Sequence, residues 1–129
     1  MIFLKYRLED ITHWNGLDNL SLAISVFTFQ FIAERHRLTL MKQIYDNLIE
    51  GGAFVFSEKV FSANSKIQNM MEFLYYDHKQ ESFTEKQILG KEQELRHLAK
   101  LTNEDLLFDQ LRSIGFTGIQ TFWRNFNFI

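Results

Sequence analysis

The distribution of apolar residues along the chain predicts alternating strands and helices. Residues 19–31 are almost uninterrupted apolar, which is typical of a strand buried on both faces of a parallel sheet. In residues 33–50 the apolar positions recur at helical spacing, and Gly51-Gly52 follows, a pair that commonly ends a helix through a left-handed residue. Residues 53–59 form a second apolar run. The order strand, helix, strand predicts a βαβ unit with two parallel strands.

The rest of the chain is predicted to be helical and then extended. Amphipathic spacing predicts three further helices, the second of them with Thr84 as N-cap, over residues 65–76, 84–98 and 103–114. Gly115 is expected to end the last of these helices. Two extended segments follow, at residues 116–123 and 126–129. Before the first long strand, residues 3–6 are expected to form a fragmentary strand and residues 7–18 a loop. The pattern as a whole is that of the α/β class.

Composition sets the size and the class of the protein. With 129 residues, no proline, no linker and no internal repeat, residues 1–129 are expected to form one domain. Hydrophobic residues make up 46% of the chain, enough for a buried core. The net charge of -2 disfavours nucleic-acid binding through bulk electrostatics. The chain has no cysteine and no apolar run of the ~20 residues that a membrane-spanning helix needs. Lys5 and Arg7 come too early for a signal peptide, so we expect a cytoplasmic protein.

Few residue patterns point directly to chemistry. The four histidines are scattered without the spacing of a metal site, and no Ser-His-Asp or paired-carboxylate pattern stands out, so we name no metal ligand and no catalytic residue. Glu58-Lys59 ends a predicted strand, where we favour a solvated terminus with a loose ion pair over a role in a site. Residues 75–79 are rich in hydrogen-bonding groups and are either a substrate lid or the amphipathic end of a helix. Arg35 to Arg37 are expected to be a solvated, basic helix start.

Several short motifs resemble one enzyme family. The run Phe27 to Phe31 is followed by the helix that ends near Leu48, by Gly51-Gly52 and by Ser57-Glu58-Lys59. The same order continues through further short motifs at residues 76–79, 83–85, 115–116 and 125–128. Over about residues 20–128 this series is similar to the carboxy-S-adenosyl-L-methionine synthases, which belong to the class I S-adenosylmethionine-dependent methyltransferases.

The resemblance implies a fold and a reaction. The chain would be the C-terminal half of a Rossmann-like methyltransferase fold, a three-layer α/β/α arrangement from its fourth strand onward, without the N-terminal cofactor-binding strands. The family is expected to convert S-adenosylmethionine and prephenate into carboxy-S-adenosylmethionine, the donor for carboxymethylating a tRNA wobble uridine. By position only, Val26, Phe27 and Thr28 would touch the cofactor, and Tyr76, Lys91 and Glu92 would face the substrate.

The chain departs from the family pattern at informative positions. It has no glycine-rich turn after a strand, so binding of S-adenosylmethionine by this chain alone is not expected. Val26 stands where the family has an asparagine, and Glu92 stands where the family has an arginine that grips the added carboxylate. The resemblance places the end of this chain, at Ile129, inside the family's last strand.

Three functions therefore stay open. The first is a truncated carboxy-S-adenosylmethionine synthase relative with a small-molecule substrate. The second is a fragment of a plain S-adenosylmethionine-dependent methyltransferase. The third is a non-catalytic remnant or interaction module, which would pair with a second copy or with a separate N-terminal half through the apolar edge of residues 20–27. In none of the three do we expect direct contact with nucleic acid or membrane.

Overall fold

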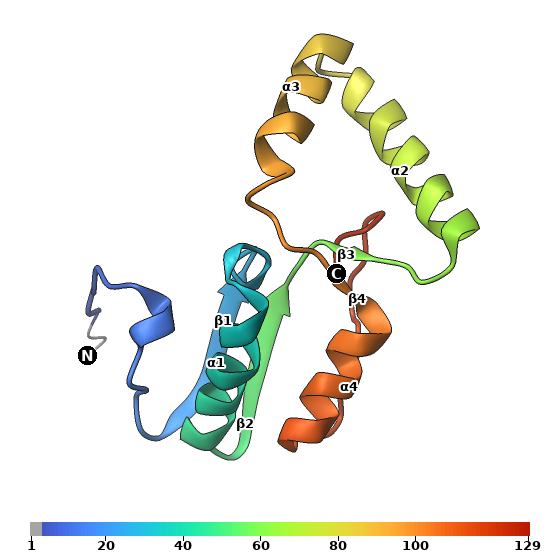
Figure 1. Ribbon diagram of the computed structural model, residues 1–129. Helices are drawn as coiled ribbons and strands as arrows, with labels where there is room; N and C mark the ends of the chain where they lie inside the picture. Colours follow the sequence, from blue (N-terminus) through green and yellow to red (C-terminus); the bar gives the residue numbers. More distant parts are fainter. Residues whose placement is uncertain (1–3) are drawn as a thin grey trace.

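The computed structural model describes residues 4–129 and confirms the α/β class (Figure 1). The first three residues, and with them part of the predicted fragmentary strand, lie outside the described residues. Leu4 to Tyr6 form no strand. The helices and strands follow one another along the chain in the order η1 (Ile11–His13), β1 (Leu20–Val26), η2 (Phe29–Phe31), α1 (Glu34–Asn47), β2 (Leu48–Ser57), β3 (Val60–Phe61), α2 (Ser65–Gln80), α3 (Glu85–Leu95), β4 (Thr102–Asn103) and α4 (Glu104–Ile114).

The predicted βαβ unit is confirmed. β1 and β2 pair in parallel, from Leu22 opposite Ala53 to Val26 opposite Ser57, and α1 connects them. The glycine pair does not end α1, which stops at Asn47. Gly51 instead has a φ of +75° inside β2, where the register shifts between Leu20 and Leu22 of the partner strand. This is the position of a bulge, and glycine adopts that φ without a steric cost.

The first predicted strand is shorter than expected because the backbone turns after Val26. Phe27 has a φ of +49°, and the chain then enters the short helix η2. β1 is also not buried on both faces. Leu22, Ile24 and Val26 are 49%, 66% and 60% exposed on the face opposite the core, so among residues 4–129 the predicted third layer is not present.

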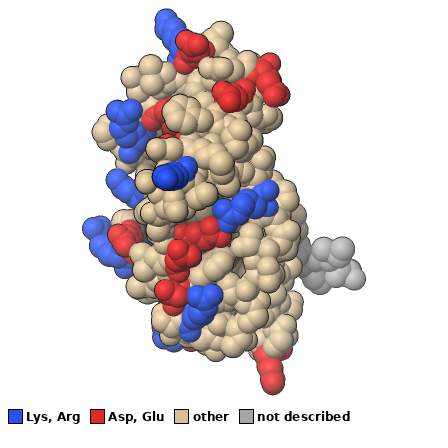
Figure 2. Space-filling model, turned by 90° about the vertical axis from the view of Figure 1, so that its right-hand side faces the viewer, with Lys and Arg blue, Asp and Glu red and all other residues tan. Residues whose placement is uncertain are grey.

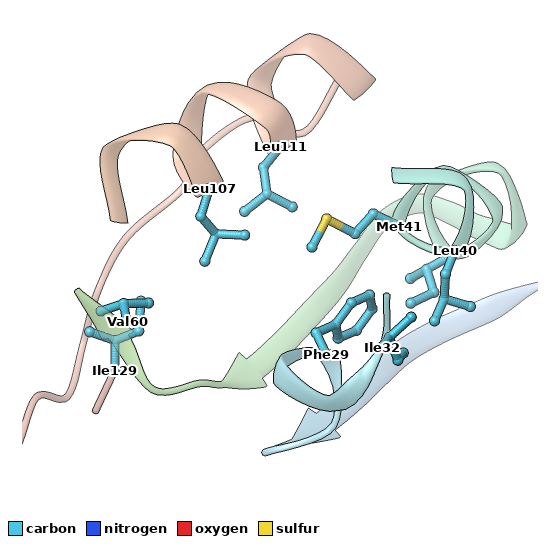
Figure 3. Close-up of a cluster of buried hydrophobic side chains, with 9 residues drawn as sticks. Phe29, Ile32, Leu40, Met41, Val60, Leu107, Leu111 and Ile129 are labelled. Atoms are coloured by element: carbon cyan, nitrogen blue, oxygen red, sulfur yellow. The ribbon is translucent and has the colours of Figure 1, made fainter. Parts of the chain in front are cut away.

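The core lies on the other face of the sheet, between β2, α1 and α4 (Figure 3). Met41 from α1 and Leu107 and Leu111 from α4 point toward one another there, and Phe29 of η2 closes one end. Val60 and Ile129 join the same cluster, which ties the end of the chain to the strand after β2. Burial of these apolar side chains is the main stabilising term for this part of the molecule.

The predicted N-cap at Thr84 and the predicted end of the last helix at Gly115 are confirmed. Thr84 forms a capping box with Gln87 at the start of α3, and Asn103 accepts a hydrogen bond from the Leu106 N–H at the start of α4. Gly115 ends α4 with a φ of +123°. α2 extends to Gln80, beyond the predicted end, whereas α3 stops at Leu95, short of it.

The last predicted strands are mostly wrong. Residues 116–123 are irregular, because Gly118 has a φ of +62° and interrupts the extended backbone. The final residues do pair, but briefly. Glu58 and Ile129 exchange two backbone hydrogen bonds of 3.0 Å, and the Val60 N–H donates to the Asn127 carbonyl at 2.8 Å. The end of the chain thus lies antiparallel to the segment that leaves β2.

Candidate functional site

The carboxyl ends of β1 and β2 lie at one edge of the sheet, and the chain changes direction there. Val26 lies opposite Ser57, and the Phe27 N–H donates to the Ser57 carbonyl at 2.8 Å. In open α/β sheets ligands bind outside this edge. The residues that follow the two strands are therefore the first candidates for a site.

Glu58, the first residue after β2, is buried and holds this edge together. Its carboxylate accepts hydrogen bonds of 2.8 Å from the backbone N–H groups of Phe29 and Gln30, at the start of η2. Only 5% of Glu58 is exposed, so the predicted solvated terminus is wrong. Burial raises the pKa of the Glu58 carboxyl, and the hydrogen bonds to the N–H groups oppose that rise only in part.

Arg37 is buried as well, against the expectation of a solvated helix start. Its Nε donates to the Ile32 carbonyl at 2.9 Å, and its other nitrogens donate to the Lys100 carbonyl and the Thr102 hydroxyl. Burial lowers the pKa of Arg37, and the charge of Glu58 opposes that change. Arg37 thereby ties α1 to the segment that returns from the α2–α3 hairpin.

The α2–α3 hairpin stands apart from the sheet, as Figure 1 shows, and a large cleft lies between the hairpin and the strand edge. The cleft has a volume of about 1200 Å³. Its walls carry many aromatic side chains, among them Phe27, Phe31, Phe73, Tyr75, Tyr76, Phe83 and Phe128. A cleft of this composition suits a small molecule with an apolar body.

The structure brings most of the predicted site residues together. Tyr76, Lys91 and Glu92, expected to face the substrate, all line this cleft. Of the three residues expected beside the cofactor, Phe27 lines it too. Val26 does not, because its side chain lies on the exposed face of β1 and borders a separate apolar pocket of about 520 Å³. The hydroxyl of Thr28 donates to the Val26 carbonyl at 3.1 Å.

An ion pair crosses the hairpin inside the cleft. The Lys79 ammonium of α2 lies 3.0 Å from the Glu92 carboxylate of α3 and 4.2 Å from the centre of the Tyr75 ring. Burial by itself lowers the pKa of Lys79, but the hydrogen bonds and charges of Glu92 and Tyr75 together outweigh it, so the pKa is raised. Burial and the Glu92 charge both raise the pKa of Tyr76. The segment 75–79 is thus both the end of a helix and a wall of the cleft.

Lys59, for which the sequence favoured a solvated strand terminus over a role in a site, lines the cleft. Its ammonium lies 5.4 Å from the centre of the Tyr75 ring and 5.8 Å from that of Phe128. The only available signal was its position directly after β2, and nothing in the sequence placed the distant Tyr75 and Phe128 beside it.

The surface carries no single dominant charge on the face shown in Figure 2, where basic and acidic side chains are interspersed. Within residues 4–129, no three His, Asp or Glu side chains are grouped so that they could hold a metal ion. None of the helices over the same residues combines the length and the apolar character needed to cross a membrane.

Comparison with curated proteins identifies relatives of the chain. It is 35% identical over 113 residues to a carboxy-S-adenosyl-L-methionine synthase of Shewanella piezotolerans, and 31% identical over 121 residues to that of Methylococcus capsulatus. The chain is a relative of the carboxy-S-adenosyl-L-methionine synthases. The resemblance inferred from the motifs is thereby confirmed.

The matched regions cover 87% and 93% of this chain but only 46% and 50% of the two relatives. The match to the carboxy-S-adenosyl-L-methionine synthase of Shewanella halifaxensis, at 32% identity, also covers 87% of this chain and 46% of that relative. The chain therefore spans about half the length of the curated relatives it matches. No protein-family model matches it.

Proposed function

We propose that this chain is the substrate-facing part of an S-adenosylmethionine-dependent transferase that is related to the carboxy-S-adenosyl-L-methionine synthases. The observation that carries the proposal is the convergence of Phe27, Tyr76, Lys91 and Glu92 on one cleft beside the carboxyl ends of β1 and β2. The relatives are named carboxy-S-adenosyl-L-methionine synthases. Position and relationship thus agree on where a ligand would bind.

The residues present do not by themselves fit S-adenosylmethionine. Val26 and Phe27 offer apolar contact only, and the Phe27 N–H is already bonded to Ser57. Glu58 ends a strand, where a carboxylate could hold a ribose, but both of its oxygens accept from the backbone of η2. Within residues 4–129 no glycine-rich strand-to-helix turn is present. Cofactor binding would need a second chain segment.

Isothermal titration with S-adenosylmethionine and S-adenosylhomocysteine tests this part of the proposal. We expect no saturable heat for the chain alone. Saturable binding appears only after an N-terminal half, taken from one of the relatives as a separate polypeptide, is added. Saturable binding by the chain alone would overturn the assignment of an incomplete cofactor site.

The Lys79–Glu92 pair favours plain methyl transfer over synthesis of a carboxylated cofactor. A ligand carboxylate near Glu92 would meet a like charge, and Lys79, the nearest cation, is already neutralised. With the N-terminal half supplied, mass spectrometry of products from S-adenosylmethionine and prephenate tests the proposal. We expect no carboxylated cofactor from the natural chain and a detectable amount from the Glu92→Arg variant. Carboxylated product from the natural chain would contradict it. The role in tRNA modification and the cytoplasmic location stay predictions.

A second candidate function, an interaction module, has its own support in β1. Its outer face is apolar and exposed, and among the described residues it pairs only with β2, which leaves the other edge without a strand. Such an edge pairs readily with another chain, either a second copy or a separate N-terminal half. Light scattering after size-exclusion chromatography distinguishes these partners. If the edge is the interface, Ile24→Lys abolishes association, whereas Lys86→Met, a change on the exposed start of α3, leaves it intact.

A further inference from the structure

Two ammonium groups gather around one aromatic ring in the cleft. Lys79 lies 4.2 Å from the centre of the Tyr75 ring and Lys59 lies 5.4 Å from it. Lys79 is neutralised by Glu92. For the Lys59 ammonium, by contrast, residues 4–129 provide no hydrogen-bond acceptor and no ion-pair partner. The cleft therefore has a cation whose charge the described residues do not compensate directly.

The backbone of Lys59 is held firmly by buried groups. Its N–H donates to the side-chain oxygen of Gln30 at 3.0 Å, and Gln30 is itself buried. Lys59 also forms an antiparallel bridge with Phe128, and the preceding Glu58 is bonded to Ile129 and to the start of η2. The ammonium thus extends from a fixed point over the rings of Tyr75 and Phe128.

This arrangement has the elements of an anion subsite. A half-buried ammonium loses part of its hydration, and a ligand oxygen that replaces water there forms a charge-assisted hydrogen bond. The rings of Tyr75 and Phe128 supply an apolar wall beside the charge, which suits a carboxylate attached to an apolar body. The other carboxylates that line the cleft, Asp77 and Glu85, form no ion pair with Lys59.

We propose that Lys59 is the anchor of a carboxylate subsite in this cleft, beside Tyr75 and Phe128. The inference deepens the proposed function and rests on the assignment of the cleft to the substrate. According to this proposal, a ligand carboxylate binds beside Lys59, at the end of β2, and not beside Glu92 of α3. Lys59 is a specificity-determining residue for an anionic ligand.

Titration with benzoate, and with benzamide as its neutral counterpart, tests the subsite without any cofactor. Backbone amide shifts of Lys59, Tyr75 and Phe128 in nuclear magnetic resonance spectra give the location and the affinity. We expect saturable shifts with benzoate and at least about tenfold weaker binding of benzamide, which corresponds to about 1.4 kcal/mol. Lys59→Met should weaken benzoate binding by a similar factor, while Lys86→Met, a change of an exposed lysine of α3 that does not line the cleft, leaves it unchanged. Glu92→Gln should strengthen binding, because it releases Lys79 as a second cation.

Equal binding of benzoate and benzamide, no saturable shift with benzoate, or an unchanged affinity in Lys59→Met would overturn the proposal. If Lys59→Met does not fold, as judged by circular dichroism, the benzamide comparison and Glu92→Gln still decide the question. Because these titrations contain no S-adenosylmethionine, their result is independent of the cofactor titration. Lys59-dependent benzoate binding stands even if the transferase proposal fails.

Discussion

The Nζ of Lys79 lies 3.0 Å from the Oε1 of Glu92, and this pair joins the end of α2 to α3. Only 16% of the Lys79 side chain and 24% of that of Glu92 are exposed. At this depth an ion pair is screened less than on the surface. The residue that departs from the family pattern, Glu92, thus has a local partner that accommodates its charge.

We expect Lys79 and Glu92 to stabilise the hairpin jointly. A double-mutant cycle with Lys79→Met and Glu92→Gln should give a coupling free energy of about 1 kcal/mol in urea unfolding. The exposed pair Lys42 and Asp46, at 2.8 Å on α1, is the control and should give less than about 0.5 kcal/mol. Equal coupling in the two cycles would mean that burial adds nothing to the hairpin pair.

The buried carboxyl of Glu58 makes stability depend on pH. Its pKa is raised in the folded protein, so the folded state binds this proton more tightly than the unfolded state. The stability from this group is fully present below its unfolded pKa, near pH 4.5, and is lost as the pH rises through the folded pKa. We therefore expect the difference in unfolding free energy between the natural chain and Glu58→Gln to narrow as the pH rises above about 4.5.

Urea unfolding at a series of pH values measures this effect, since every other titrating group is common to both proteins. At the acidic end Glu58→Gln should cost about 1–3 kcal/mol, because an amide has one acceptor oxygen for the two N–H groups of η2. If the difference in unfolding free energy between the natural chain and Glu58→Gln widens as the pH rises, the folded state favours the ionised carboxylate instead.

Arg37 should be irreplaceable even by lysine. Its guanidinium donates to three acceptors, from Ile32, Lys100 and Thr102, whereas an ammonium is a single point that cannot reach all of them. Arg37→Lys should lower the free energy of unfolding by about 1–3 kcal/mol and speed amide exchange around residues 100–103. Arg35→Lys, an exposed change two residues earlier, should stay within about 0.5 kcal/mol. Equal effects of the two would show that the hydrogen bonds of Arg37 to Lys100 and Thr102 do not stabilise the fold.

Replacing Gly52 or Gly90 by alanine should change the free energy of unfolding in opposite directions. A Cβ on Gly52 would lie 2.9 Å from the Ile49 carbonyl oxygen and 3.0 Å from that of Leu20, and backbone atoms cannot move aside cheaply. Gly52→Ala should therefore destabilise the β1–β2 pair by at least about 1 kcal/mol. Gly90 lies inside α3 with no atom within 4 Å of an added Cβ, so Gly90→Ala should stabilise by about 0.5–1 kcal/mol. Thermal unfolding of both variants checks the signs.

The sequence correctly predicted those structural elements that depend on residues close together along the chain. The N-cap at Thr84, the end of α4 at Gly115 and the parallel β1–β2 pair all follow from short-range patterns. Residues 116–123 are apolar enough for a strand but form none, because a strand needs a partner and Gly118 breaks the extended backbone. The sequence also could not predict that the outer face of β1 is exposed, because an apolar run does not reveal which segment packs against it.

For the site, the sequence by itself determined the family resemblance, the absence of a glycine-rich turn and the presence of Glu92 in place of arginine. These are properties of residue identity and order. Only the tertiary structure decided that Glu58 is buried and accepts hydrogen bonds from the start of η2, and that Arg37 joins α1 to Lys100 and Thr102. It also decided that Lys59 meets Tyr75 and Phe128 in one cleft. These residues lie far apart along the chain, and their contacts exist only because packing of β2, the hairpin and the final residues brings them together.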